Sequence, residues 1–222
     1  MLGLYDGVIP FGKLKTKGDF GIGTTHRLNG EMIMLNGAAY RIEADGKVYP
    51  IMDSDTTPFA VVTHFQSQKT ININSPVDLD KLQKKLNSLF VSKNYFYAIR
   101  IDGTFKQVKV RSVPAQNKPY PLLTDVVKKQ TVFTLDNITG TLAGFWCPAF
   151  VSGVNVPGFH FHFISDDRKS GGHVLGLETG QIKINISVVR EFKIILPENN
   201  EFMNTDFTPN MDREIHTVER GR

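Results

Sequence analysis

The chain has 222 residues, of which 41% are hydrophobic, 10% aromatic and 22% charged, and its formal net charge is +4. This is the composition of a folded globular protein that is long enough to bury a core. Basic residues form no run interleaved with aromatic residues, which argues against a nucleic-acid partner. No apolar stretch approaches the ~20 residues that cross a bilayer, no signal peptide is recognisable, and the single cysteine, Cys147, cannot form an internal disulfide. We therefore expect a cytoplasmic protein without a membrane partner.

Tight turns punctuate the first third of the chain, where short strands are predicted. Asn-Gly ends the segments 28–30 and 35–37, and Asp-Gly occupies 45–46, each between apolar stretches. Such dipeptides between apolar runs are the strongest short-range signal of a β-hairpin. The mostly apolar segment 58–65 predicts a buried strand, and the Asp-Gly at 102–103 predicts a further hairpin between two strands.

One longer helix is predicted at 76–90, between the strands. Ser75 is expected as its N-cap and Pro76 as its first residue, and leucines recur at three- and four-residue spacing. This spacing gives the helix an apolar face that packs on a sheet. The segment 114–121 contains three prolines and predicts a loop before a short helix at 122–129.

The second half of the chain is again rich in predicted strands. They follow one another as GTLAGFWC, GFHFHFI, HVLGLE, QIKINISVV and EFKIIL, and residues 210–220 predict a terminal helix. We expect an α+β fold that is rich in β structure, with mixed or antiparallel sheets and a few short helices. If the chain divides, the first part is residues 1–130, with the helix at 76–90, and the second is residues 131–222. The composition does not shift enough at 130–140 to establish a boundary, so one compact unit is the alternative.

Three of the six histidines lie close together in the second part. Side chains alternate along a strand, so His160 and His162 point to one side and the phenylalanines beside them to the other. The sequence SDDRKSGG is rich in turn formers and predicts that the chain doubles back. If Gly171 then pairs with Ile164, His173 lies opposite His162. The three imidazoles would converge from adjacent strands.

Three converging imidazoles are typical of a zinc site that keeps a further position open for water or substrate. Asp166 and Asp167 in the turn are either partners that orient these imidazoles or solvated turn residues. The remaining histidines suggest no such site. His26 and His64 are expected to be structural, and His216 lies in a polar tail.

The segment 144–176, GFWCPAFVSGVNVPGFHFHFISDDRKSGGHVLG, resembles the core signature of bacterial alpha-acetolactate decarboxylases. The segments 18–42, 57–65 and 100–121 are similar to further blocks of that family, in the same order. The resemblance extends over nearly the whole chain and is far more specific than His-x-His alone. Family members usually carry a further segment before the stretch that resembles LGLYDG, so this chain is expected to begin later than they do.

The resemblance implies a reaction, a cofactor and an assembly. It implies a carboxy-lyase that converts 2-acetolactate to acetoin and carbon dioxide, with one Zn²⁺ held by His160, His162 and His173. These are the same histidines that the spacing brings together. The zinc would stabilise an enediolate, which a glutamic acid then protonates. The resemblance also implies two sheet-based parts, with the zinc held by the second, and a homodimer.

The resemblance adds four further residues to the site. Thr24 would contact the substrate, Arg111 would hold its carboxylate with a planar fork of donors, and Glu31 or Glu219 would deliver the proton. Without the resemblance, Glu31 reads as a solvent-facing strand residue and Glu219 as an ordinary helix charge. Arg111 shares a strand face with Gln107, which is typical of a solvated face. Which glutamate acts stays open.

Two alternatives from other classes stay open beside the decarboxylase. A cupin-like metal-dependent oxygenase also uses His-x-His on a β scaffold, but cupins usually place a glutamate three or four residues later. This chain has Ser165 and Asp166 there. A non-enzymatic β domain stapled by zinc would need a fourth protein ligand and would leave no exchangeable water.

Overall fold

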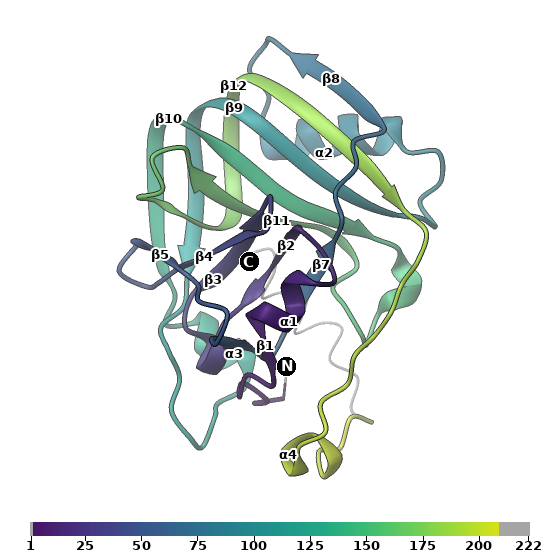
Figure 1. Ribbon diagram of the computed structural model, residues 1–222. Coiled ribbons are helices and arrows are strands. Elements are labelled where there is room, and N and C mark those ends of the chain that lie inside the picture. Colours follow the sequence, from purple (N-terminus) through teal and green to yellow (C-terminus); the bar gives the residue numbers. More distant parts are fainter. Residues whose placement is uncertain (1, 209–222) are drawn as a thin grey trace.

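Residues 2–208 are described by the computed structural model, in which two five-stranded antiparallel sheets pack against each other (Figure 1). The smaller sheet has the spatial order β5 (Val48–Pro50), β4 (Ala38–Ile42), β3 (Glu31–Leu35), β2 (Phe20–Thr24) and β7 (Ala60–Thr63). The larger sheet has the order β11 (Gly158–Ser165), β10 (Thr131–Cys147), β9 (Phe96–Ser112), β12 (Gly171–Val189) and β8 (Lys69–Ile73). A separate short pair joins β1 (Ile9–Pro10) and β6 (Thr56–Thr57). The predicted β-rich α+β fold is confirmed.

The described helices are short and lie between the strands. They are α1 (Phe11–Lys15), η1 (His26–Leu28), α2 (Leu79–Leu89), α3 (Leu123–Val127), η2 (Ala149–Val151) and α4 (Asn200–Met203). The predicted long helix is confirmed as α2, but its expected start is wrong. Asp78, and not Ser75, is the N-cap, because its carboxylate accepts a hydrogen bond of 2.8 Å from the Lys81 N–H. The residues before it stay extended because the Val77 N–H donates to the Thr179 hydroxyl of β12 at 3.0 Å.

Two of the turns predicted from Asn-Gly and Asp-Gly are confirmed, and a third is longer than predicted. Asn36 and Gly37 take positive φ of 51° and 78° between β3 and β4, and Gly46 takes a φ of 80° between β4 and β5. At 28–30 the flanking strands β2 and β3 do pair, but the connection also contains η1. The sequence therefore locates these pairings better than it sizes the loops.

The hairpin predicted at 102–103 is wrong, because β9 continues through this point as one long strand. Gly103 pairs with Gly140 of β10 on one side and with Ile182 of β12 on the other. It has a φ of +149°, and a Cβ at this position would lie 2.2 Å from the carbonyl oxygen of Gln181. Glycine is therefore required here by the close approach of another backbone, and not by a turn.

The larger sheet curls until its pairing closes. β9 pairs with both β10 and β12, and β11 pairs with β10 and also with the start of β12. In this last pairing His162 lies opposite His173, and Ile164 lies opposite Gly171. The register predicted for the histidine hairpin is confirmed.

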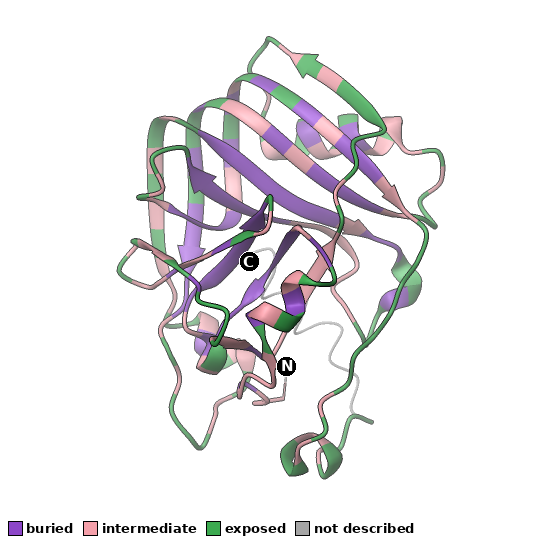
Figure 2. Ribbon diagram, in the orientation of Figure 1, coloured by how far each residue is buried: buried purple, intermediate pink, exposed green. Residues whose placement is uncertain are grey.

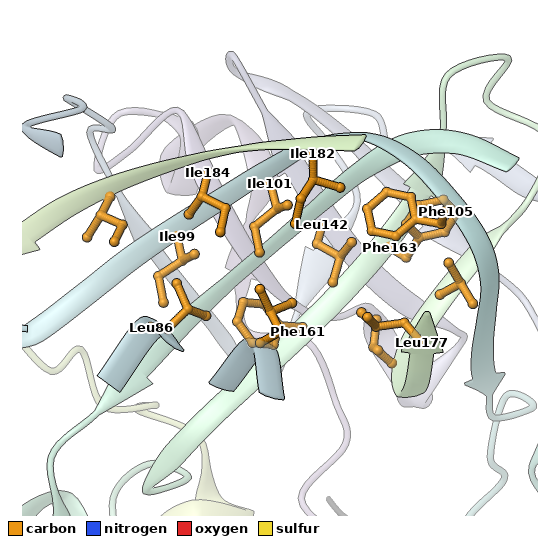
Figure 3. Packing of buried hydrophobic residues seen from close by; sticks show 14 of the residues in the cluster. Leu86, Ile99, Ile101, Phe105, Leu142, Phe161, Phe163, Leu177, Ile182 and Ile184 are labelled. Atoms are coloured by element: carbon orange, nitrogen blue, oxygen red, sulfur yellow. The ribbon is translucent and has the colours of Figure 1, made fainter. Parts of the chain in front are cut away.

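The curled sheet has two differently packed faces. Inside the curl, Phe161 and Phe163 of β11 meet Leu86 of α2 and side chains of β9, β10 and β12 (Figure 3). On the opposite face, Ile164 and Phe145 pack against Ile33 and other residues of the smaller sheet. The strands of both sheets are largely buried where they face each other (Figure 2). The histidines of β11 therefore point toward the smaller sheet.

The two sheets do not follow the expected division of the chain at residue 130. β8 and β9 precede this point, and β10 to β12 follow it, yet all five strands belong to the larger sheet. Among the described residues, no helix has the length and apolar character needed to span a membrane. The predicted terminal helix at 210–220, with His216 and Glu219, lies outside the described residues.

Candidate metal centre and its surroundings

Three imidazoles meet where β11 and β12 pair. The Nε2 atom of His160 lies 3.2 Å from Nε2 of His162 and 3.0 Å from Nδ1 of His173. The ligand atoms of the three lie within 4.8 Å of one another. Among residues 2–208, these three side chains form the group of His, Cys, Asp and Glu residues that could hold a metal ion. His162 and His173 are 1% and 2% exposed. A single ion can thus be reached by all three rings.

The surroundings of His160 and His162 favour the neutral imidazole that a metal requires. The Nδ1–H of His162 donates to the Met32 carbonyl oxygen at 2.7 Å, which leaves the Nε2 lone pair facing the other rings. Burial lowers the pKa of His160 to about 3, and the positive charge of Arg111 adds to this effect. Burial also holds the pKa of His162 well below its usual value. Neutral imidazoles with one fixed lone pair suit a bound divalent metal.

Glu31 reaches the same place from the smaller sheet. It is the first residue of β3, where side chains alternate, and it shares the face of Ile33, which packs toward the larger sheet. Its Oε2 atom lies 3.4 Å from Nε2 of His162, and the residue is 9% exposed. The reading of Glu31 as a solvent-facing strand residue is therefore wrong.

Arg111 approaches from the end of β9. Its backbone pairs with His173 of β12 and with Val132 of β10, so that it sits beside the histidines. It is 4% exposed, and its Nη1 donates to Oε1 of Gln130 at 3.2 Å. Its buried Nε has no hydrogen-bond partner among the described residues. The expected solvated face is wrong at this position, because the closing of the sheet covers the end of β9 while Gln107 stays exposed.

The family model of alpha-acetolactate decarboxylase matches residues 1–209. The chain belongs to this family. The alpha-acetolactate decarboxylase of Methanosarcina mazei is 45% identical over 220 residues, covering 99% of this chain and 76% of the relative. That of Brevibacillus brevis is 43% identical, covering 100% of this chain and 78% of the relative. The crystal structure of alpha-acetolactate decarboxylase from Bacillus subtilis aligns with a TM-score of 0.96 at 37% identity, covering 99% of this chain and 94% of that chain.

The remaining predicted residues of this decarboxylase family member lie in different places. Thr24 pairs with Glu31 across β2 and β3 and is buried, but its hydroxyl donates to the Gly30 carbonyl oxygen at 2.7 Å and so holds the connecting loop. Asp166 and Asp167 are exposed. The Asp167 carboxylate accepts from the Ser165 hydroxyl at 2.6 Å, which makes it a turn residue. Glu219 lies outside the described residues.

Two contacts of the site were not predicted from the sequence. The Met32 carbonyl is a backbone group, and no side-chain pattern marks it. Gln130 stands between α3 and β10, far from Arg111 in sequence, and a single glutamine after a short helix carries no recognisable signal. Both follow from the pairing of strands, which brings distant residues to one place.

Proposed function

We propose that this protein decarboxylates 2-acetolactate to acetoin and carbon dioxide, with Zn²⁺ held by His160, His162 and His173. One observation carries the proposal. In a chain of this family, three imidazoles, two of them buried and that of His160 half-buried, converge with a carboxylate and a guanidinium that also come from separate strands. The family match favours this function over a cupin-like oxygenase. A zinc staple would need a fourth protein ligand, whereas the described cluster consists of three histidines.

The donor set fits zinc, because three neutral imidazoles are typical ligands of a catalytic zinc ion. When bound, the metal would supply Lewis acidity to the ketone and hydroxyl oxygens of the substrate. The chain's own contribution is to hold the rings ready. The Met32 carbonyl fixes the tautomer of His162, and the surrounding core excludes bulk water from the buried rings.

Arg111 is proposed to bind the substrate carboxylate. Its buried Nε lacks a hydrogen-bond partner among the described residues, and an unpaired buried donor is costly until a ligand engages it. A carboxylate accepts two parallel N–H bonds from a guanidinium, which matches this need. The carboxylate would then be oriented beside the histidines before carbon dioxide leaves.

Glu31 or Glu219 is proposed to deliver the proton to the carbon that loses carbon dioxide. The position of Glu31, 3.4 Å from His162 Nε2, supports a role at this place. The proposal for Glu219 rests on the family resemblance of the chain end. A positioned general acid accelerates a reaction by roughly 10²–10⁴-fold.

The direct test is to incubate the purified protein with racemic 2-acetolactate and to measure acetoin, carbon dioxide and bound metal. We expect turnover with one zinc per chain. The double change His160→Ala and His162→Ala should remove both metal and turnover, whereas the exposed His64→Ala should change neither. Full zinc occupancy in the double variant would overturn the metal site, and a zinc-loaded parent without turnover would overturn the reaction.

The homodimer and the cytoplasmic location stay predictions. Support for the dimer comes from large apolar side chains that are exposed after β12, at Phe192, Ile194, Ile195 and Leu196, with exposures of 46%, 46%, 44% and 59%. Such a cluster is common at an interface between chains. Light scattering should give twice the chain mass of 24.9 kDa, and replacing Ile194 and Leu196 by serine should shift the protein toward monomer. A parent that scatters as a monomer would contradict the dimer.

A further inference from the structure

Gln130 is fixed at the junction between α3 and β10. Its backbone N–H donates to the Val127 carbonyl oxygen at 3.2 Å, in the turn that ends α3. The next residue, Thr131, begins β10 and pairs with Ser112 of β9. The backbone of Gln130 is therefore held on both sides, and its side chain starts from a defined point close to the end of β9.

From this point the Gln130 side chain reaches Arg111. Its Oε1 atom accepts the Arg111 Nη1–H at 3.2 Å, while Arg111 Nε keeps no partner among the described residues. The amide oxygen is a neutral acceptor. It orients the guanidinium through one donor without cancelling its charge, and it leaves the remaining donors for an anion. A carboxylate in its place would pair with Arg111 and compete with that anion.

We propose that Gln130 is a positioning residue that aims the Arg111 guanidinium at the substrate carboxylate and keeps the site selective for a carboxylate-bearing hydroxyketone. This inference rests on the proposed function, in which Arg111 binds that carboxylate. It predicts that substitution of Gln130 lowers the affinity for ligands that carry a carboxylate and leaves the affinity for neutral ligands unchanged.

Two substitutions at Gln130 separate orientation from charge. Gln130→Met keeps the length of the side chain and removes the acceptor, so KM for 2-acetolactate should rise roughly threefold to tenfold, which is the effect of one lost hydrogen bond. Gln130→Glu keeps the acceptor and adds a negative charge, so KM should rise further than in Gln130→Met. In both variants kcat should change less than KM, because binding of the intact carboxylate is affected.

A neutral ligand gives the readout that a merely structural role would not produce. Acetoin lacks the carboxylate, and its inhibition constant should be the same for the parent and both Gln130 variants. Bound zinc should also stay at the parent level, since the metal ligands are untouched. Loss of affinity for acetoin and acetolactate alike would overturn the proposal, because it would indicate general damage to the site.

Gln107 of β9 offers a matched control. Its side-chain Nε2 donates to Asp136 at 2.9 Å, and the residue is exposed. Gln107→Met should leave KM unchanged. If Gln130→Met does not fold, Gln130→Glu decides alone, because it retains both volume and acceptor. A parental KM in Gln130→Glu would overturn the proposal.

The failure of this inference is distinguishable from failure of the proposed function. If Arg111→Ala raises KM strongly while both Gln130 variants bind acetolactate as the parent does, Arg111 binds the carboxylate without help from Gln130. If Arg111→Ala leaves KM unchanged, the role proposed for Arg111 is itself wrong.

Discussion

The two faces of β11 differ in what they bury, although they belong to the same eight residues. On one face, Phe161 and Phe163 join an apolar cluster inside the curled sheet. On the other face, His160 and His162 meet His173, Glu31 and other polar groups between the two sheets. Apolar burial stabilises the first face directly, whereas each polar group on the second requires a partner.

This difference separates stability from chemistry within a single strand. The phenylalanine face has nothing that titrates or coordinates a metal. The histidine face has its ring pKa values lowered by burial and its tautomer set by the Met32 carbonyl. We therefore expect substitutions on the phenylalanine face to lower the free energy of unfolding, and substitutions on the histidine face to alter metal binding and turnover.

The largest effect on turnover is expected for Glu31, which lies against the histidine face. Glu31→Gln removes a proton donor while keeping the side-chain volume, so turnover should fall by roughly 10²–10⁴-fold if Glu31 is the acid. Bound zinc should stay at the parent level, and the exposed Glu191→Gln should leave turnover unchanged. Deleting residues 215–222, which removes Glu219, is the complementary measurement. If that deletion abolishes turnover while Glu31→Gln does not, Glu219 is the acid.

The phenylalanine face should show the opposite behaviour. Phe163 is 0% exposed, and Phe163→Ala should lower the free energy of unfolding by about 3–5 kcal/mol through lost burial and a cavity. Phe150 is 65% exposed, and Phe150→Ala should stay within about 0.5 kcal/mol. Urea unfolding measures both. Zinc per folded chain should be unchanged in either variant. Loss of zinc from folded Phe163→Ala would show that the two faces are not independent.

Arg111 tests whether a charge on the histidine face also contributes to stability. Because it is buried and bonds Gln130, Arg111→Lys should lower the free energy of unfolding by about 2 kcal/mol, more than a surface change does. The exposed Arg190→Lys should cost less than about 0.5 kcal/mol. Turnover should fall in Arg111→Lys but not in Arg190→Lys, since lysine lacks the planar pair of N–H donors that binds a carboxylate. Equal stabilities for the two variants would indicate that burial of Arg111 has no energetic consequence.

Local sequence patterns correctly predicted those features of the fold that depend on neighbouring residues alone. Strand alternation and the turn-rich SDDRKSGG were sufficient for the register that pairs His162 with His173. The same reasoning failed at 102–103, because an Asp-Gly that would form a turn in an isolated hairpin lies inside β9, paired on both sides. The helix start moved to Asp78 because Val77 is held by Thr179 on a distant strand. Tertiary pairing overrode local preference in both cases.

The polar residues of the site were the hardest to predict from the residues alone. Glu31 and Arg111 resembled solvated strand positions, because alternation indicates which face a side chain shares but not what covers that face. The smaller sheet covers one, and the closing of the larger sheet covers the other. The family resemblance implied a role for both residues, whereas no motif marks Gln130, which is noticed only through its contact with Arg111.

The smallest expected effect on stability concerns Cys147, which packs in the apolar cluster between the two sheets. Burial raises the pKa of its thiol from 9.0 to about 12. The folded state therefore favours the neutral thiol. Its contribution to stability is complete below the unfolded pKa near 9.0 and is lost as pH rises toward about 12.

At one pH unit above 9, the free energy of unfolding of the parent should have fallen by about 1.4 kcal/mol more than that of Cys147→Ala, relative to neutral pH. Urea unfolding of both proteins over this range measures the difference, and the effects of other titrating groups cancel in the comparison. Parallel pH profiles would show that the thiol ionises without unfolding the protein, and that water reaches the space between the sheets more easily than the phenylalanine core.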